Sequence, residues 1–145
     1  MTNLLPLIIV VCAGAAVALQ PSINARLAQK AGLVESACIS FAVGTLALVI
    51  VLLLSGKTNI RGLQETAWWE WTGGVLGAFF VSATILAVPR IGTTATMAVA
   101  IATQLITALL LDHFGVFGFG GMQIDLKRSL GAALLIIGAW IIVRH

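Results

Sequence analysis

A continuous apolar segment, SACISFAVGTLALVIVLLL, occupies residues 36–54 and contains no Asp, Glu, Lys or Arg. A helix that crosses the hydrocarbon core of a bilayer needs about 20 such residues. An ionisable side chain at the bilayer centre costs at least about 2.5 kcal/mol, so charged residues mark where such helices end. The segment therefore predicts a membrane-spanning helix.

Four further segments of the chain are free of these charges, namely residues 1–25, 71–89, 91–111 and 129–143. The last is about 22 Å long at about 1.5 Å per residue. The basic residues at its two ends can extend its reach to the membrane surface. We predict an all-α integral membrane protein with a single five-helix domain over residues 1–145, its helices at 4–29, 33–54, 67–88, 93–111 and 128–143.

The composition excludes most other classes of protein. Hydrophobic residues make up 60% of the 145 residues and charged residues 9%, whereas soluble domains carry about 25% charged residues. The net charge of +3 comes from eight Lys and Arg without a basic run, so we expect no nucleic-acid partner. Cys12 and Cys38 lie in apolar segments without metal-ligand spacing, and no nucleophile–base pair or phosphate-binding loop is present. We expect no metal, no cofactor and no enzymatic activity.

The basic residues divide equally between the two membrane faces. Five spans place the termini on opposite sides, and the basic side chains of cytoplasmic loops normally set the orientation. One face holds Lys57, Arg61, Lys127 and Arg128, and the other holds Arg26, Lys30, Arg90 and Arg144.

This balance predicts that the chain inserts in both orientations. Two oppositely oriented copies would form an antiparallel dimer, a ten-helix unit with inverted halves like those of many secondary transporters. A separately encoded paralogue of opposite orientation would serve equally well as the partner.

Three segments carry a resemblance to a known family. They are QPSINARL at residues 20–27, WWEWTGGVLGAFFV at residues 68–81, and Gln104 through Gly115, which ends in DHFG. The chain resembles the YdcZ-type family of small bacterial inner-membrane proteins in the drug/metabolite transporter superfamily. The resemblance implies a five-helix protomer in the inner membrane, encoded in such families by dual-topology single genes, paired genes or fused genes. Small multidrug exporters, which are distantly similar, exchange protons through a glutamate in helix 1, and this chain has no acidic residue there.

A candidate substrate-binding site lies in the first helix. Gln20 and Asn24 are four residues apart and share one helix face. Pro21 lacks an N–H group and should kink the helix, which frees the carbonyl of Val17. These groups could bind a neutral solute, or the two amides could instead join helices.

Further candidates come from the third and fourth helices. Gln104 near mid-bilayer and Thr103 beside it could line a cavity, although packing between helices is the alternative. Trp71 lies deeper than Trp68 and Trp69 and could stack against a substrate. The alternative for all three tryptophans is an interfacial aromatic belt.

Three ionisable residues could couple transport to an ion or gate it. Asp112 lies at the carboxyl end of the fourth helix, where the helix dipole disfavours its charge. His113, Lys127 or Arg128 could bind it. Glu35 lies in the first turn of the second helix, where the alternative is a helix cap or a surface ion pair. Arg90 follows a proline in a short turn.

Two groups of glycines predict close helix contacts, because small residues let helix backbones approach. The group in helix 3 could serve a sliding contact and the group in helix 5 could join two protomers, and packing within the protomer is the alternative for both groups. These residues are Gly73, Gly74 and Gly77 in helix 3, and Gly131 and Gly138 in helix 5.

The sequence favours a small-molecule transporter that works by alternating access as an antiparallel dimer in the inner membrane. A dual-topology ion channel and a non-transporting accessory subunit of a membrane complex are the two alternatives. A channel would show currents far above carrier rates, and an accessory subunit would show no activity when purified alone.

Overall fold

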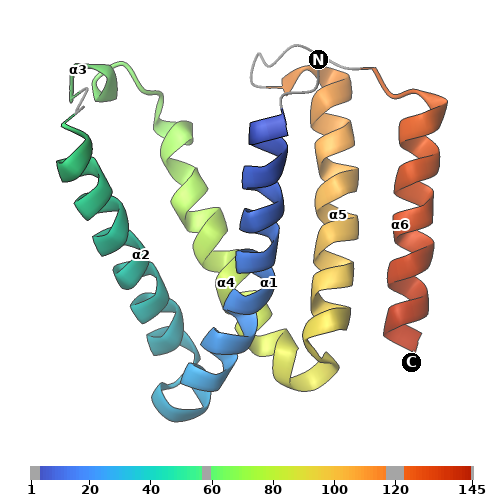
Figure 1. Ribbon diagram of the computed structural model, residues 1–145, viewed down its shortest axis with the longest axis horizontal. Helices are drawn as coiled ribbons and strands as arrows, with labels where there is room; N and C mark the ends of the chain where they lie inside the picture. Colours follow the sequence, from blue (N-terminus) through green and yellow to red (C-terminus); the bar gives the residue numbers. More distant parts are fainter. Residues whose placement is uncertain (1–3, 57–59, 117–122, 145) are drawn as a thin grey trace. The chain divides into compact units, whose positions relative to one another are not determined.

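The computed structural model describes residues 4–56, 60–116 and 123–144, and all regular structure in these ranges is helical. Figure 1 labels the elements along the chain. They are α1 (Leu4–Ala31), α2 (Leu33–Ser55), α3 (Ile60–Leu63), the 3₁₀ helix η1 (Trp68–Thr72), α4 (Gly73–Ile91), α5 (Thr93–Phe114) and α6 (Leu126–Arg144).

Five of these segments are long and apolar enough to cross a membrane, so the prediction of five spans is confirmed. They are α1, α2, η1 with α4, α5 and α6. The third span begins as a 3₁₀ turn at Trp68 and continues as α4 through Pro89 to Ile91. The fifth begins at Leu126, before its two basic residues.

The chain forms two compact units, residues 1–89 and residues 90–145. In the first unit α1 and α2 run antiparallel and meet at Gly32, while α4 packs against this hairpin (Figure 1). The ribbon of α1 changes direction in its second half, as expected for a helix with Pro21 in its interior. The buried apolar centre of this unit consists of Ala37, Val81 and Ile85, with Ala28, Leu33 and Phe80 packed around it.

A single glycine connects α1 to α2, and another connects α4 to α5. Gly32 has φ 101° and ψ 160°, and Gly92 has φ 81° and ψ 160°. This region of backbone conformation is essentially restricted to glycine. In both turns the backbone N–H four residues later donates to the glycine carbonyl: Ser36 to Gly32 over 3.0 Å and Thr96 to Gly92 over 3.1 Å.

The two glycine turns belong to a repeated pattern with a spacing of 60 residues. The buried positions of α1 are Pro21, Asn24 and Ala25, and those of α4 are Val81, Thr84 and Ile85. A basic residue lies two positions before each glycine, Lys30 in one turn and Arg90 in the other. The two glycine turns therefore share one backbone conformation and one pattern of buried positions before them.

The second unit is a hairpin of α5 and α6, which lie side by side and antiparallel (Figure 1). Its buried contacts involve small side chains, which include Ala102 on α5 and Ala132 and Ala139 on α6. Gly115 ends α5 in the left-handed conformation, and its N–H donates to the Asp112 carbonyl over 3.3 Å. Such a glycine is a common helix terminator.

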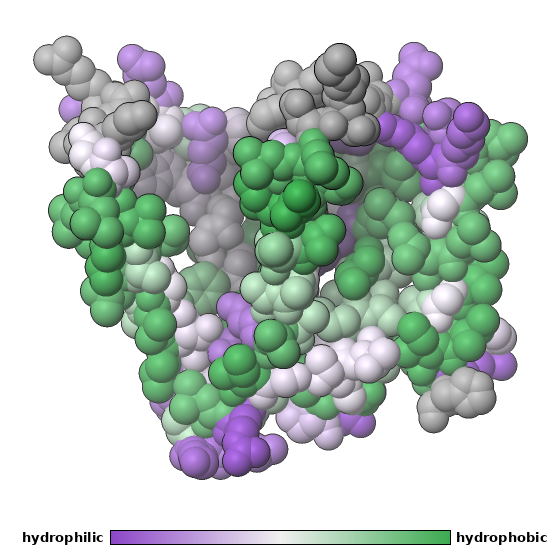
Figure 2. All heavy atoms as spheres, in the orientation of Figure 1, coloured by the Kyte–Doolittle hydropathy of each residue, from purple (hydrophilic) through white to green (hydrophobic). Residues whose placement is uncertain are grey.

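The spanning helices expose large apolar side chains along their length. In the most apolar 18-residue stretch of α2, 6% of the residues are buried. Leu48 and Leu54 in this helix are 70% and 82% exposed. Figure 2 shows hydrophobic residues over the bodies of α2 and α6 and hydrophilic residues at helix ends. Helices that are apolar all round have hydrocarbon or another apolar helix as their surroundings, which is what a membrane provides.

Candidate substrate-binding groove

A buried hydrogen-bond network connects α1 to α2 near their turn. The side-chain N–H of Asn24 donates to Ser40 Oγ over 3.1 Å, and the Ser36 hydroxyl donates to the Asn24 carbonyl over 2.7 Å. Asn24 is 5% exposed and Ser36 is fully buried. The side-chain amide and the backbone carbonyl of Asn24 thus both bind residues of α2, and the side-chain amide holds Ser40 in place.

We predict that Ser36→Ala lowers the free energy of unfolding by about 0.6 to 1.7 kcal/mol, the mean and the maximum measured for hydrogen bonds between membrane helices. The substitution leaves the Asn24 carbonyl without its α2 donor. The measurement is the thermal unfolding midpoint of purified protein in detergent.

Thr107→Ala is the matched control for this variant, because the exposed Thr107 hydroxyl donates only within its own helix, to the Thr103 carbonyl over 2.9 Å. A midpoint for Ser36→Ala no lower than that of Thr107→Ala would contradict an interhelical role for Ser36.

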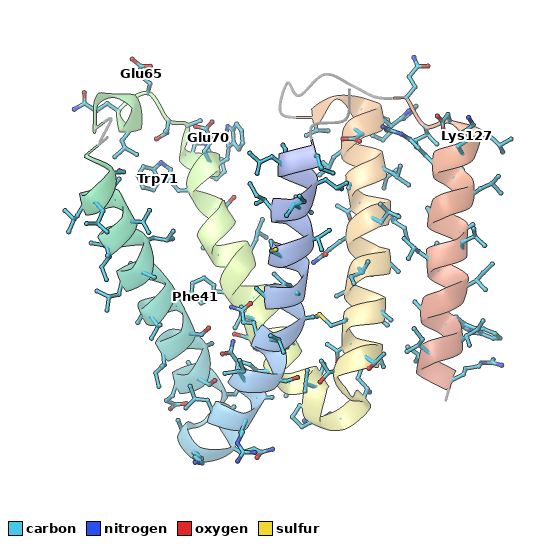
Figure 3. All side chains as sticks on the ribbon, in the orientation of Figure 1. Phe41, Glu65, Glu70, Trp71 and Lys127 are labelled. Carbon is cyan, nitrogen blue, oxygen red and sulfur yellow. The ribbon has the colours of Figure 1, made fainter. Side chains whose placement is uncertain are left out.

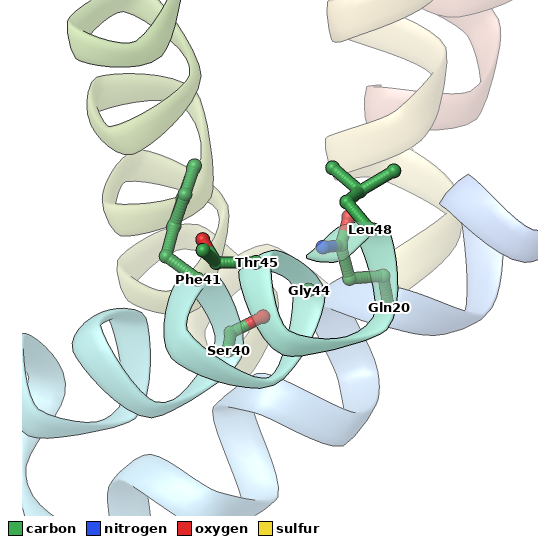
Figure 4. A pocket seen from close by; sticks show the side chains of 6 residues that line it. All are labelled: Gln20, Ser40, Phe41, Gly44, Thr45 and Leu48. Carbon is green, nitrogen blue, oxygen red and sulfur yellow. The ribbon is translucent and has the colours of Figure 1, made fainter. Parts of the chain in front are cut away.

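A groove of about 210 Å³ opens beside this network, between α1 and α2. Figure 4 shows Gln20 entering it from α1 and the other lining residues from α2. A Cβ at Gly44 would meet nothing within 4 Å, so the missing side chain leaves space there. The lining residues are Gln20, Ser40, Phe41, Gly44, Thr45 and Leu48.

Gln20 brings an amide into the groove in the central part of α1. The residue is half-buried, and its side chain has no hydrogen-bond partner among the described residues. In a bilayer each unsatisfied polar group costs several kcal/mol. The Gln20 amide therefore needs a partner from outside the described chain: water, a solute or another protein.

Phe41 forms one wall of the groove and also touches α4. A Cβ built on Gly77 would lie 3.4 Å from Phe41 Cζ, whereas Cβ atoms at Gly73 and Gly74 would meet nothing within 4 Å. Figure 3 shows Phe41 between α2 and α4. Of the three glycines Gly73, Gly74 and Gly77 in α4, Gly77 is the one that faces a neighbouring side chain.

Trp71 lies at the membrane-surface end of its span and does not line the groove. Its indole N–H donates to Thr66 Oγ1 over 3.1 Å, and Trp71 is 63% exposed. Glu70 accepts the Ala67 N–H over 2.6 Å and caps the same turn. Figure 3 shows Trp71 and Glu70 together at this end of the unit. These contacts fix the aromatic segment against the loop that precedes it.

In the second unit, Gln104 and Thr103 are exposed residues at the middle of α5. The Gln104 amide, like that of Gln20, has no partner among the residues that the structure describes. The hydroxyls of Thr96 and Thr107 donate to backbone carbonyls four residues earlier, over 2.7 and 2.9 Å. This helix therefore presents one amide without a partner at mid-length.

Asp112 and Arg128 form an ion pair where α5 and α6 approach each other. The guanidinium nitrogen lies 3.5 Å from the carboxylate oxygen, so the expected partner across the connection is present. Asp125 caps α6 by accepting the Arg128 backbone N–H over 2.7 Å. The pair borders a groove of about 380 Å³ that Gly131 also lines, whereas a Cβ at either Gly131 or Gly138 would meet nothing within 4 Å.

The other two ionisable candidates lie at helix ends on the glycine turns. The Glu35 carboxylate lies against Gly32, so that a Cβ at that glycine would collide with it. Arg90 is an exposed residue in the last turn of α4.

Sequence reasoning did not single out Ser40, Phe41 or Thr45, which form most of the groove's α2 wall. The sequence does contain a signal for two of the lining residues, Ser40 and Gly44. Together with Ser36 they recur every four residues and so occupy one face of an otherwise apolar helix. Such a small and polar stripe marks the side of a membrane helix that faces another helix or a cavity.

Comparison with known proteins places the chain in a family. Residues 5–141 match the family model described as "Putative inner membrane exporter, YdcZ". The chain is 32% identical over 150 residues to the inner membrane protein YdcZ of Escherichia coli (strain K12). This match covers 100% of the chain and 99% of that protein. No solved structure matches it. With five apolar spans and similarity over almost its whole length, the chain belongs to the YdcZ family of exporters and is a multi-pass transport protein of the inner membrane.

Proposed function

We propose that this chain exports a small organic molecule by alternating access, as an antiparallel dimer with a second copy of itself or with an oppositely oriented paralogue. The observation that carries the proposal is the Gln20 amide, which enters a groove about midway along α1 and has no partner among the described residues. Ser40 and Thr45 supply hydroxyl groups beside it, and a transport substrate would satisfy all three.

The equal distribution of basic residues supports the inverted dimer, because it gives neither orientation an advantage. The open face of α6 supports it as well. Gly131 and Gly138 lie two turns apart, and neither has a neighbour at the Cβ position. Glycines so spaced allow a second helix to approach the backbone closely, and we assign this face to the contact between protomers.

The two protomers of such a dimer are related by a two-fold axis in the membrane plane, and this symmetry makes a transport cycle possible. When the two inverted protomers exchange conformations, a midplane site opens to the other face of the membrane. Gln104 with Thr103 on α5 would add a second set of polar groups at mid-depth. Asn24 would act by holding Ser40 toward the groove, and Trp71 would anchor its span at the surface.

The ionisable candidates are assigned to gating or coupling at the membrane surfaces. The Asp112–Arg128 pair closes one end of the α5–α6 groove and could open as the helices move. Counting five spans puts Glu35 and Arg90 at the membrane face opposite the Asp112–Arg128 pair, where they would alternate with that pair in the inverted partner.

Flux through reconstituted protein tests this function. We expect proteoliposomes to move at least one member of a panel of small metabolites, and Gln20→Ala to reduce that flux about tenfold, the effect of losing about 1.4 kcal/mol.

Gln29→Ala is the matched control, because Gln29 is an exposed amide near the end of the same helix and lies outside the groove. Protein that reconstitutes normally yet moves no solute would contradict the transport proposal. Flux that survives Gln20→Ala unchanged would remove the groove from it.

A further inference from the structure

Among the described residues that line the groove between α1 and α2, none carries a charge that could neutralise a charged ligand. Its lining residues are amide, hydroxyl, aromatic, aliphatic and glycine in character. Among the described residues, Asp, Glu, Lys and Arg occur only in the connections or within six residues of a helix end. A charge placed in this groove would lie in the apolar part of the membrane without a counter-charge, and such placement is costly.

The groove does contain unused hydrogen-bonding groups. The Gln20 amide offers two N–H donors and a carbonyl acceptor. Hydroxyl groups in membrane helices usually donate to a carbonyl of their own helix, as those of Thr84, Thr96 and Thr107 do here. The Ser40 and Thr45 hydroxyls donate to no group in the part of the chain that the structure describes.

The walls beside these polar groups are apolar and the space is small. Phe41 and Leu48 flank the polar side chains, and Gly44 leaves the α2 wall flat (Figure 4). The volume of about 210 Å³ is below the range of about 300 to 1,000 Å³ that is usual for drug-sized ligands. The groove of one protomer thus fits a molecule of metabolite size with one apolar side.

We propose that the substrate of this groove is a small uncharged solute that has hydrogen-bond donors and acceptors on one side and an apolar group on the other. The proposal rests on the transport function proposed above and names its substrate class. A two-fold axis in the membrane plane keeps mid-membrane residues at mid-membrane. A second inverted copy would therefore add a second Gln20 amide at the same depth, and no acid or base.

Ligands that share one apolar group and differ in the charge of their polar group test this class. We expect 3-phenylpropionamide, but neither 3-phenylpropionate nor 3-phenylpropylamine, to raise the thermal unfolding midpoint of the full-length protein, because a ligand that binds only the folded state stabilises it. Cyclohexyl and branched-alkyl versions of the three compounds complete the panel. Gln20→Ala should weaken binding of the amide about tenfold, and Gln29→Ala should leave it unchanged.

A charged variant should reverse the preference for uncharged ligands. Its expected result is a gain of binding, which a misfolded protein would not show. Gln20→Glu keeps the shape of the side chain and adds a carboxylate, so it should bind 3-phenylpropylamine at least about tenfold more tightly than the wild-type protein does. The same variant should lose preference for the amide. A Gln20→Glu protein that gains no affinity for the amine would show that Gln20 does not contact the ligand.

Binding of an anionic or cationic member by the wild-type protein in preference to the uncharged one overturns the substrate class. Failure of every uncharged member to bind overturns it too. These results are distinct from failure of the transport function. A wild-type protein that carries a charged member of the panel across liposome membranes remains a transporter with a different substrate, whereas one that carries nothing fails the first proposal.

Discussion

Gly32→Ala should leave little folded protein in the membrane. The backbone at Gly32 has φ 101° and ψ 160°, a region in which a residue with a side chain is strained by about 1 to 3 kcal/mol. The new Cβ would also displace the Glu35 carboxylate that lies against this glycine, but this adds little because the carboxylate is the end of a flexible, exposed side chain. Because the turn places Ser36 and Asn24 for their buried contacts, we expect lower yield and a lower unfolding midpoint in detergent.

Gly92→Ala is the natural control, since it isolates the conformational strain from the collision. Gly92 has φ 81°, and a Cβ there would meet nothing within 4 Å. We expect Gly92→Ala to be about as destabilising as Gly32→Ala, and the double variant Gly32→Ala/Glu35→Ala to show no recovery, because the exposed Glu35 side chain can move away from the new Cβ. A Gly32→Ala protein that is much less stable than Gly92→Ala and recovers in the double variant would show that the Glu35 contact, and not the backbone conformation, causes the effect.

The membrane architecture could be predicted from the sequence because charge spacing determines it. An ionisable residue cannot lie cheaply at mid-bilayer, so the gaps between charges gave the number of spans. The same reasoning placed Asp112 near its partner but left His113, Lys127 and Arg128 as alternatives, and the structure pairs it with Arg128.

The groove could not be predicted, because its α2 side depends on how two helices diverge from their turn. Thr45 and Phe41 are ordinary residues for an apolar helix, and only the turn at Gly32 places them opposite Gln20.

The repeated turn was hidden for a related reason. Asn24 and Thr84 occupy equivalent buried positions, as do Ser36 and Thr96, but their chemical identities differ. The shared feature is the backbone conformation of two glycines.

Two lysines added to either membrane face should abolish transport by forcing one orientation. Gln64→Lys/Gln123→Lys changes the count of basic residues from four against four to six against four, and Gln29→Lys/Ala31→Lys changes it to four against six. The excess of basic residues sets the orientation, so each variant should insert in one way only. Terminal tags, found on both sides of the membrane for the wild-type protein, should then be found on one side, and they should differ between the variants.

Coexpression of the two variants provides the decisive measurement. If the active unit is an inverted pair, each variant alone should show flux near background, and the two together should restore it, because each supplies the orientation that the other lacks. A paralogue of opposite orientation would support only the variant that complements it. Full flux from a single variant that has one orientation and no partner would overturn the antiparallel dimer, while the groove and its uncharged substrate would stand independently.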